Sequence, residues 1–308
     1  MLSRVLKIMM MVICLASVAI PDSRAKESLI MGDQAGRNVQ VPVRPVRVIA
    51  LAPSVTEIVF ALGRGDRLVG VTDFSDYPEA ARRITSVGSY VYLDIEKIVS
   101  LKPDLCIAVK DGNPLAIVRR IEAFGIPVFA VNPRDLESVM ASVMDIGKLL
   151  DADESAHSLI SDMKQRLDRI EARVSKAVSR PRVFFQIGVS PIVSAGSDTF
   201  IHELIVRAGG KNLAGNLAGY PRFSREEVLA LSPDIVIVTS MERQDTFDRV
   251  IENWQEWPDL PAVTNERIFL VDSDLFDRPT PRLIDALEKL VRLIHPELFN
   301  EDTGENSK

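Results

Sequence analysis

LDIEKIVSLKPDLCIAV (residues 93–109) and FSREEVLALSPDIVIVT (residues 223–239) are two versions of one unit, 130 positions apart. Each reads as a short helix, a turn containing proline and an apolar strand. A spacing this long does not fit a solenoid, so the pattern predicts a duplicated pair of domains. Five positions are identical in the two stretches: Glu96 and Glu226, Leu101 and Leu231, Pro103 and Pro233, Asp104 and Asp234, and Ile107 and Ile237.

On both sides of these stretches, helical patterns alternate with apolar strands. RLVGVT and IPVFAV read as strands in the first half, and RVFFQIG and RIFLVD read as strands in the second. This alternation is typical of α/β domains with a mostly parallel sheet. After the strand in VRVIALA, Ser54 and Glu57 predict a capping box at the start of a helix.

Residues 153–178 predict one long helix between the two halves. Its apolar residues recur at intervals of three and four, and no glycine or proline interrupts it. A helix of this length spans roughly 39 Å, enough to cross a domain. We therefore expect an α/β fold with two similar lobes, residues 26–152 and 179–298, joined by this helix. The polar tail, residues 299–308, is expected to be disordered.

The N-terminus has the features of a secretory signal peptide. Basic Arg4 and Lys7 precede an apolar run over residues 8–20, which is shorter than the roughly 20 residues that span a bilayer. We expect cleavage after Ala25 and release of a soluble chain. A lipid anchor at Cys14 fits less well, because bulky Ile13 precedes it. The mature chain then keeps only Cys106, which we expect to be a small buried apolar residue without a disulfide.

Composition and motifs argue against several classes of protein. A net charge of -6 disfavours nucleic-acid binding. The sequence contains no G-x-S-x-G elbow, Walker phosphate loop or G-x-G-x-x-G dinucleotide fingerprint. His157, His202 and His295 lie in predicted helices without metal-ligand spacing. We therefore expect no catalytic residues, no metal site and no cofactor.

The connecting segments carry the aromatic residues. All four tyrosines lie in DFSDYP, GSYVYLD and AGYPRFS, and DSDLFDRPTPR adds Asp274, Phe276 and Arg278 after a strand. In open α/β sheets the ligand lies beyond the carboxyl ends of the strands. Aromatic residues with a few polar groups there suit a large, flat, partly apolar ligand. The simpler interpretation is that each tyrosine covers the base of its own loop.

Over residues 45–295 the chain resembles the class III periplasmic binding proteins of ABC importers. The stretches that carry the resemblance are SDYP, LDIEKIVSLKPDL, DGNP, RVFFQIGVSP, SREEVLALSPD and SDLFDRPTPR. The resemblance implies two lobes joined by one long helix and a ligand that is cobalamin, haem or a ferric siderophore. The stretches are most similar to those of the cobalamin-binding members.

The resemblance also gives the repeated glutamates a role. It implies that Glu96 and Glu226 dock onto arginines of the two permease subunits of the importer. Asp94 and Ser224 are expected N-caps, which places both glutamates in the first turn of a helix. The helix dipole alone favours an acidic residue there by roughly 0.3–1 kcal/mol, which is the competing explanation.

The resemblance implies a ligand site at matching positions. Tyr90 and Tyr220 stand where a cobalamin-binding relative has tryptophan, Val109 replaces another tryptophan, and Ile187 replaces a phenylalanine. The expected ligand-binding residues are Tyr77, Tyr90, Val109, Ile187, Tyr220, Asp274, Phe276 and Arg278.

We therefore expect a monomeric periplasmic protein that captures a corrinoid and delivers it to the permease dimer of an ABC importer. Three alternatives stay open. Haem would take an axial ligand such as Tyr90 or Tyr92, and an anionic ferric siderophore would use Arg278 and Arg222. An enzyme acting on a metal chelate would need ligand cysteines, and the mature chain has only Cys106.

Overall fold

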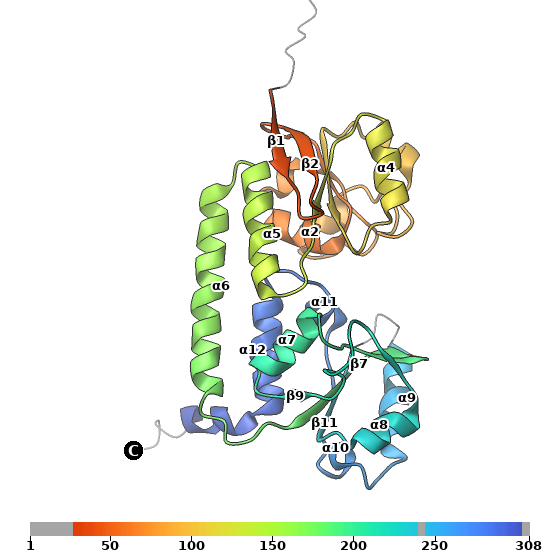
Figure 1. Cartoon of the computed structure of the whole chain (residues 1–308), viewed down its shortest axis with the longest axis vertical. Helices are drawn as coiled ribbons and strands as arrows, with labels where there is room; N and C mark the ends of the chain where they lie inside the picture. Colours follow the sequence, from red (N-terminus) through yellow and green to blue (C-terminus); the bar gives the residue numbers. More distant parts are fainter. Residues whose placement is uncertain (1–26, 240–243, 304–308) are drawn as a thin grey trace, which may run out of the picture.

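The computed structural model describes residues 27–239 and 244–303, which form two α/β lobes joined by a long helix (Figure 1). The predicted fold class is therefore confirmed. The predicted signal peptide, with Cys14 and the cleavage position after Ala25, lies outside the described residues. None of the helices described is long and apolar enough to cross a membrane.

The N-terminal lobe, or N-lobe, contains a four-stranded parallel sheet in the order β4-β3-β5-β6. A separate hairpin, β1 with β2, precedes it and was not predicted. The strands are β1 (Ser28–Gly32), β2 (Asn38–Pro42), β3 (Val48–Ala50), β4 (Leu68–Gly70), β5 (Leu105–Val109) and β6 (Val128–Val131). The helices are α2 (Pro53–Ala61), η2 (Gly65–Arg67), η3 (Glu79–Arg83), α3 (Ile95–Ser100), α4 (Leu115–Ala123) and α5 (Leu136–Leu149).

The C-terminal lobe, or C-lobe, contains a mixed sheet in the order β10-β8-β7-β11-β12, with β9 also on β7. β7, β9, β11 and β12 are parallel, whereas β8 pairs antiparallel with β7 and β10 pairs antiparallel with β8. The strands are β7 (Arg182–Val189), β8 (Ile192–Ser194), β9 (Lys211–Asn212), β10 (Arg222–Phe223), β11 (Ile235–Val238) and β12 (Ile268–Leu270). The helices are α7 (Phe200–Arg207), α8 (Arg225–Leu231), α9 (Gln244–Gln255), α10 (Pro261–Thr264), α11 (Ser273–Phe276), α12 (Leu283–Ile294) and η4 (Pro296–Thr303).

The interlobe helix is α6 (Asp153–Val174), whose 22 residues span roughly 33 Å. It begins where the sequence predicts and ends four residues before 178. The apolar face does not continue to that point, since the side chain of Val178 is 97% exposed. Ala156 belongs to the N-lobe core, whereas Met163 and Ile170 belong to the C-lobe core. One continuous helix is thus packed into both lobes.

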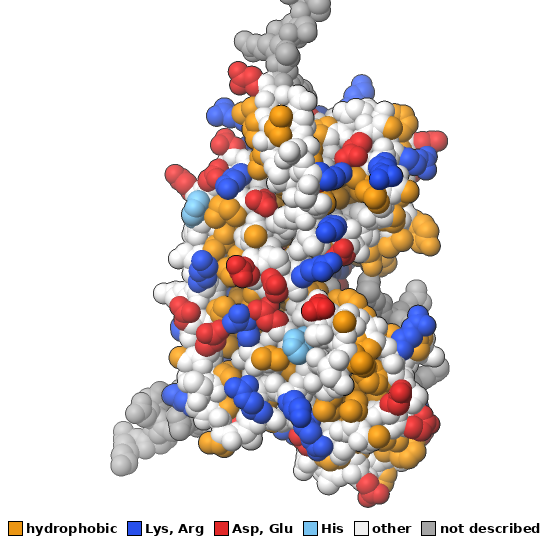
Figure 2. Space-filling model, in the orientation of Figure 1, with side chains coloured by type: hydrophobic (Ala, Val, Ile, Leu, Met, Phe, Trp, Pro, Cys, Tyr) orange, Lys and Arg blue, Asp and Glu red, His pale blue; other side chains and the backbone are white. Residues whose placement is uncertain are grey.

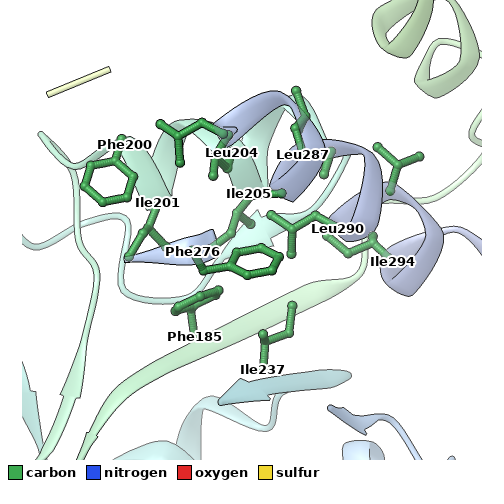
Figure 3. Close-up of a cluster of buried hydrophobic side chains, with 14 of the residues drawn as sticks. Phe185, Phe200, Ile201, Leu204, Ile205, Ile237, Phe276, Leu287, Leu290 and Ile294 are labelled. Atoms are coloured by element: carbon green, nitrogen blue, oxygen red, sulfur yellow. The ribbon is translucent and has the colours of Figure 1, made fainter. Parts of the chain in front are cut away.

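The C-lobe core lies between the sheet and helices α7 and α12 (Figure 3). Leu136 and Val139 of α5 also belong to it, so the two lobes share apolar contacts beside α6. Phe299 packs against the same core, with the guanidinium groups of Arg173 and Arg292 4.3 and 4.2 Å from its ring centre. The expectation of disorder from residue 299 is therefore wrong at Phe299, because apolar and cation–π contacts hold its ring.

The repeated stretches fold as the same helix–turn–strand unit, α3 with β5 and α8 with β11. Lys102 and Ser232, at matching positions, both have a left-handed backbone with φ of 48°. The matching aspartates each accept a backbone hydrogen bond at the beginning of the neighbouring strand, from the residue just before β3 in one copy and from the first residue of β7 in the other. Asp104 accepts from Arg47 N–H at 3.0 Å, and Asp234 accepts from Arg182 N–H at 2.7 Å. These anchors explain why aspartate occupies the same position in both units.

The predicted capping box of α2 is wrong. The helix begins at Pro53, whose fixed φ suits a first helical position, and Ala52 is the N-cap. Ser54 and Glu57 are therefore both inside the helix and buried. Glu57 instead bonds arginines of the other lobe, as described below.

Candidate ligand cleft between the lobes

A cavity of about 500 Å³ lies between the two lobes, where the loops that follow several strands face one another. In the space-filling view the lobes are separated on one side by a notch and are continuous on the side of α6 (Figure 2). The side chains that line it include Phe74, Tyr90, Val109, Asp111 and Arg134 from the N-lobe, and Asp198, Tyr220, Asp274, Asp277 and Arg278 from the C-lobe.

A larger hollow of about 690 Å³ lies at the C-terminal end of α6, beside Arg169, Arg173 and Phe299. It is lined by residues of α6, α12 and the segments that follow these two helices, and no strand end reaches it. The interlobe cavity is the better candidate, because it combines aromatic and apolar surface with polar groups from both lobes. We call it the cleft.

Five of the eight predicted ligand-binding residues lie together in the cleft: Tyr90, Val109, Tyr220, Asp274 and Arg278. Their contact with a ligand remains a prediction. Tyr77, Ile187 and Phe276 are not among the residues that line the cleft.

Phe276 is a core residue. Its side chain is 0% exposed and packs against Phe185, with ring centres 6.0 Å apart (Figure 3). The short helix α11 explains the difference from the prediction. Asp274 and Asp277 are three residues apart and share the face that meets the cleft, whereas Phe276 points to the other side. Ile187 is partly buried against the same core.

Tyr77 lies outside the cleft, in a smaller hollow next to α6. The guanidinium of Arg282 stacks over its ring at 3.8 Å, an arrangement that gives a favourable cation–π contact. Tyr77 belongs to the N-lobe and Arg282 to the C-lobe, so this contact joins the lobes.

The two cleft tyrosines occupy matching positions of the duplicated unit. Tyr90 and Tyr220 are also 130 positions apart, a signal that the sequence reasoning left unused. Asn113 donates hydrogen bonds to the carbonyl groups of Tyr90 and Leu51, both at 2.8 Å, and so positions the Tyr90 loop. Tyr220 follows Gly219, whose φ of 65° favours glycine at this turn.

Carboxylates of both lobes influence the hydroxyl group of Tyr220. Burial of its hydroxyl in the cleft raises the pKa of Tyr220, and the carboxylates of Asp277 and Asp111 raise it further. Asp111 belongs to the N-lobe and Tyr220 to the C-lobe, and both line the cleft. The Tyr220 phenol is neutral at physiological pH and can donate a hydrogen bond to a ligand.

An interlobe ion cluster lies beside the cleft. Arg278 Nη1 is 3.1 Å from Glu57 Oε1 and 2.9 Å from Asp76 Oδ1, and its Nη2 bonds Asp274. Arg282 Nη1 is 3.3 Å from Glu57 Oε2. Burial raises the pKa of Glu57, although Arg282 and Arg278 act against that shift. Arg278 therefore uses its donors to hold the lobes together, a role that the sequence did not reveal.

Asp277 is a cleft residue that the sequence analysis missed. Its Oδ1 accepts from the Thr239 hydroxyl at 3.1 Å, whereas its buried Oδ2 has no hydrogen-bond partner among the described residues. Burial raises the pKa of Asp277 to about 7, and the neighbouring carboxylates of Asp274 and Asp272 contribute. The sequence did contain a signal for it, because Asp277 follows Asp274 by three residues and so lies on the same face of a helical turn.

The charges that line the described part of the cleft are mostly negative. Arg134 Nη2 lies 2.6 Å from Asp111 Oδ2, and Arg278 is held by three carboxylates. Both arginines in the cleft lining are therefore paired. An anionic ligand would meet carboxylates here without a free cation among these residues to balance it.

The three histidines do not form a site. His295 is buried and bonds Glu297 at 2.8 Å, His202 lies 3.1 Å from Asn212 Nδ2, and exposed His157 contacts the carbonyl of Asp153. Across residues 27–239 and 244–303, no group of His, Cys, Asp and Glu side chains is arranged to hold a metal ion. Cys106 is fully buried, as predicted, and burial raises the pKa of its thiol.

Glu96 and Glu226 are exposed in the first turns of α3 and α8. The predicted caps are confirmed, since Asp94 accepts from Lys97 N–H at 3.0 Å and Ser224 from Glu227 N–H at 3.2 Å. Hydrogen bonds from its own backbone N–H and from Ser224 lower the pKa of Glu226. Each glutamate follows the cleft tyrosine of its own lobe by the same interval along the chain.

Residues 48–275 match the family of periplasmic binding proteins. The chain belongs to this family. Over 91% of its length and 91% of the relative's, it is 31% identical to an ABC transporter substrate-binding lipoprotein, YvrC, of Bacillus subtilis. It is 30% identical to the vitamin B12-binding protein of Vibrio parahaemolyticus, over 78% of this chain and 86% of that one.

The solved structures that are similar to this one include two periplasmic binding proteins whose ligands are named. The vitamin B12-binding protein BtuF of Vibrio cholerae matches with a TM-score of 0.73 and 29% identity, over 84% of this chain and 100% of that chain. A periplasmic haem-binding protein of Pseudomonas aeruginosa matches with a TM-score of 0.75 and 28% identity, over 82% and 93%. As a periplasmic binding protein, the chain is a substrate-binding protein whose partner is an ABC transporter.

Proposed function

We propose that the protein captures a corrinoid of the cobalamin type in the interlobe cleft and delivers it, as a monomer, to an ABC importer. The observation that carries this proposal is the pairing of charges in the cleft. Both arginines that line its described part are held by carboxylates, and aromatic side chains face it from both lobes. Such a site favours a flat ligand without net negative charge.

Corrinoids fit this chemistry better than the two competing ligands. A corrinoid presents a flat macrocycle edged by neutral amide groups, which the tyrosines and the cleft carboxyl groups can meet with apolar contact and hydrogen bonds. Haem carries two propionates, and most ferric siderophores are anionic chelates, so both call for an unpaired cation. Arg222, the second arginine considered for a siderophore, is not among the cleft-lining residues. The similarity to vitamin B12-binding proteins supports the same choice.

Haem is the second candidate. The cleft-lining Tyr90 and Tyr220 each offer a phenol that could ligate iron, and one similar solved structure is a haem-binding protein. Tyr92, the other tyrosine considered as an axial ligand, is 83% exposed and lies outside the cleft lining. Haem is therefore the competitor that the experiment must include.

The proposed delivery step uses the two lobe surfaces. Exposed Glu96 and Glu226 lie in equivalent places on the two lobes, which suits two equivalent basic contacts on a permease dimer. For export, we propose that the signal peptide, residues 1–25, is removed after Ala25 and that the protein acts in the periplasm. The lipoprotein among the relatives makes a lipid at Cys14 the alternative, which mass spectrometry of the mature protein distinguishes.

The test is a calorimetric titration of residues 26–308 with cyanocobalamin, with haem and with a ferric siderophore. We expect one site per chain for cyanocobalamin and weaker or no binding of the two anionic ligands. Visible absorption after desalting provides an independent measure of retained ligand. Retention of haem without cyanocobalamin would overturn the corrinoid proposal and favour the second candidate.

A further inference from the structure

Asp277 combines three properties at one place in the cleft. It lines the cleft, its Oδ1 is held by the Thr239 hydroxyl, and its buried Oδ2 lacks a hydrogen-bond partner among the described residues. A buried polar atom without a partner is destabilising, so a group that satisfied it would be stabilised there. In a binding protein, the ligand is the natural source of that group.

The groups around Asp277 disfavour its ionised form. Asp274 and Asp272, on the same segment, place negative charge beside it, and burial acts in the same direction. Arg278 opposes them, but its donors already bond Glu57, Asp76 and Asp274. From the facing elements, Tyr220 contributes a neutral phenol and Thr239 a hydroxyl donor. A ligand that filled the cleft would remove more water and disfavour the charge further.

We propose that Asp277 is a further ligand-contacting residue that is protonated in the complex, its Oδ2–H donating a hydrogen bond to a neutral carbonyl oxygen of the ligand. This inference rests on the proposed corrinoid function, because amide side chains supply such carbonyl groups. The same carboxyl group, when ionised, would repel a carboxylate ligand. Asp277 would therefore contribute to selection of an amide-edged ligand over an acid-edged one.

The sign of the pH dependence follows from this arrangement. In the free protein the pKa of Asp277 is about 7, so near neutral pH the group is partly ionised. Binding favours the protonated form and draws a proton from solvent. Affinity should therefore be highest below pH 6 and fall as the pH rises, by about tenfold between pH 6 and pH 8 for a group that binds only when protonated.

The experiment is calorimetry with cyanocobalamin at several pH values, in buffers of different ionisation enthalpy, on the wild type and Asp277→Asn. The asparagine keeps the shape and a donor but does not titrate. We expect the wild type to take up a fraction of a proton near pH 7, and Asp277→Asn to bind with little dependence on pH. Since both proteins meet the same ligand, any titration of cyanocobalamin itself cancels in the comparison.

Asp198→Asn is the matched control, because Asp198 also lines the cleft but lies on a different loop. It should keep the pH dependence of the wild type. Cyanocobalamin binding without proton uptake, or uptake that persists in Asp277→Asn, would overturn the role of Asp277 and leave the corrinoid function intact. A complete lack of cyanocobalamin binding at every pH would overturn the proposed function and this inference with it.

Discussion

The two copies of the duplicated unit lie on the two sides of the cleft. They share one helix–turn–strand backbone but differ in the residue at the carboxyl end of the strand. Both place a tyrosine in the cleft, a glutamate in an exposed first turn and an aspartate at the start of a strand. They differ where the strand ends. Val109, the last residue of β5, gives the N-lobe side an apolar residue, whereas the matching Thr239, just after β11, bonds Asp277.

The difference shows how two copies of one backbone unit can line a cleft with different side chains. The shared aspartate anchors and left-handed turns position the loops, and these parts have been kept in both lobes. The polar groups come chiefly from residues 272–278, a segment after β12 that belongs only to the C-lobe. The N-lobe side of the cleft thus presents aromatic and apolar side chains together with the Asp111–Arg134 pair, and the C-lobe side adds the acidic groups of residues 272–278.

Glu57→Ala should have the largest effect on stability, because it removes the carboxylate that links the two lobes. The Glu57 side chain is 3% exposed and serves two arginines of the C-lobe. Its loss leaves those partly buried cations with fewer partners and should lower the free energy of unfolding by about 3 kcal/mol. Urea unfolding measures this change.

Glu57→Gln is the control for Glu57→Ala, since it keeps the volume and an acceptor but loses the charge. It should fall between the alanine variant and the wild type. Equal stability of Glu57→Ala and the wild type would show that the interlobe ion cluster contributes nothing to holding the lobes together.

Replacing the two anchor aspartates separately tests whether the copies are equally important. Asp104 is buried and accepts from the backbone N–H groups of Val46 and Arg47, so Asp104→Ala should cost about 2–3 kcal/mol. Asp234 and its partner Arg182 are each more than a third exposed at the side chain. Solvent screening limits that pair, and Asp234→Ala should cost about 1 kcal/mol.

The pH dependence of stability gives a second measure of Asp234. The hydrogen bond from Arg182 lowers the pKa of Asp234 below its ordinary value of 3.8. Its contribution is therefore present above that value and is lost as the pH falls through the lowered pKa. Asp234→Asn should lessen the loss of stability in acid. If variant and wild type lost stability equally in acid, the Asp234–Arg182 ion pair would not contribute to the pH dependence of unfolding.

Alanine at either cleft tyrosine should weaken ligand binding by about 1–3 kcal/mol, the scale of an aromatic anchor. Stability should change little, since Tyr220 is 55% exposed and both residues lie in loops. Calorimetry and thermal melting measure the two effects. Tyr92→Ala is the matched control, because it removes a tyrosine from the Tyr90 loop outside the cleft lining. A large fall in melting temperature with unchanged affinity would make these tyrosines packing residues.

Glu96→Ala and Glu226→Ala should have the smallest energetic effects, about 0.2–1 kcal/mol each at the proposed importer contact. Ligand affinity should not change, whereas transport should fall partly in each single variant and further in the double variant. The residual interaction should depend less on salt. Glu137→Ala, an exposed acidic residue in the first turn of α5, is the control. Normal transport by the double variant would leave helix-dipole stabilisation as the explanation of both glutamates.

Local patterns predicted the frame of the molecule well. The duplicated unit, the caps Asp94 and Ser224 and the start of α6 all depend on residues close in sequence, so the sequence shows them directly. The same reasoning misplaced Glu57, because a capping pattern does not show which lobe a carboxylate faces. The apolar spacing did not fix the end of α6 either, since the helix ends at Val174, four residues before the predicted bound.

The cleft was predicted in part, and the errors share a cause. Membership of a loop does not fix which side of the loop a residue occupies. Phe276 turns into the core and Asp277 into the cleft, although they are neighbours, because successive side chains in a helical turn point about 100° apart. The pairing of Arg278 with Glu57 and Asp76 joins residues more than 200 positions apart, and no local pattern contains it.

The packing of α6 into both cores has a consequence for how well the proposed importer can distinguish loaded from empty binding protein. A helix without interruption, supported by the interlobe ion cluster, should keep the separation of Glu96 and Glu226 nearly constant whether or not the cleft is filled. If these two glutamates dock the importer as proposed, empty and loaded molecules should compete for the same docking place on similar terms. Producing more binding protein than ligand would slow uptake, so the rate of import should pass through a maximum as the ratio of binding protein to importer rises.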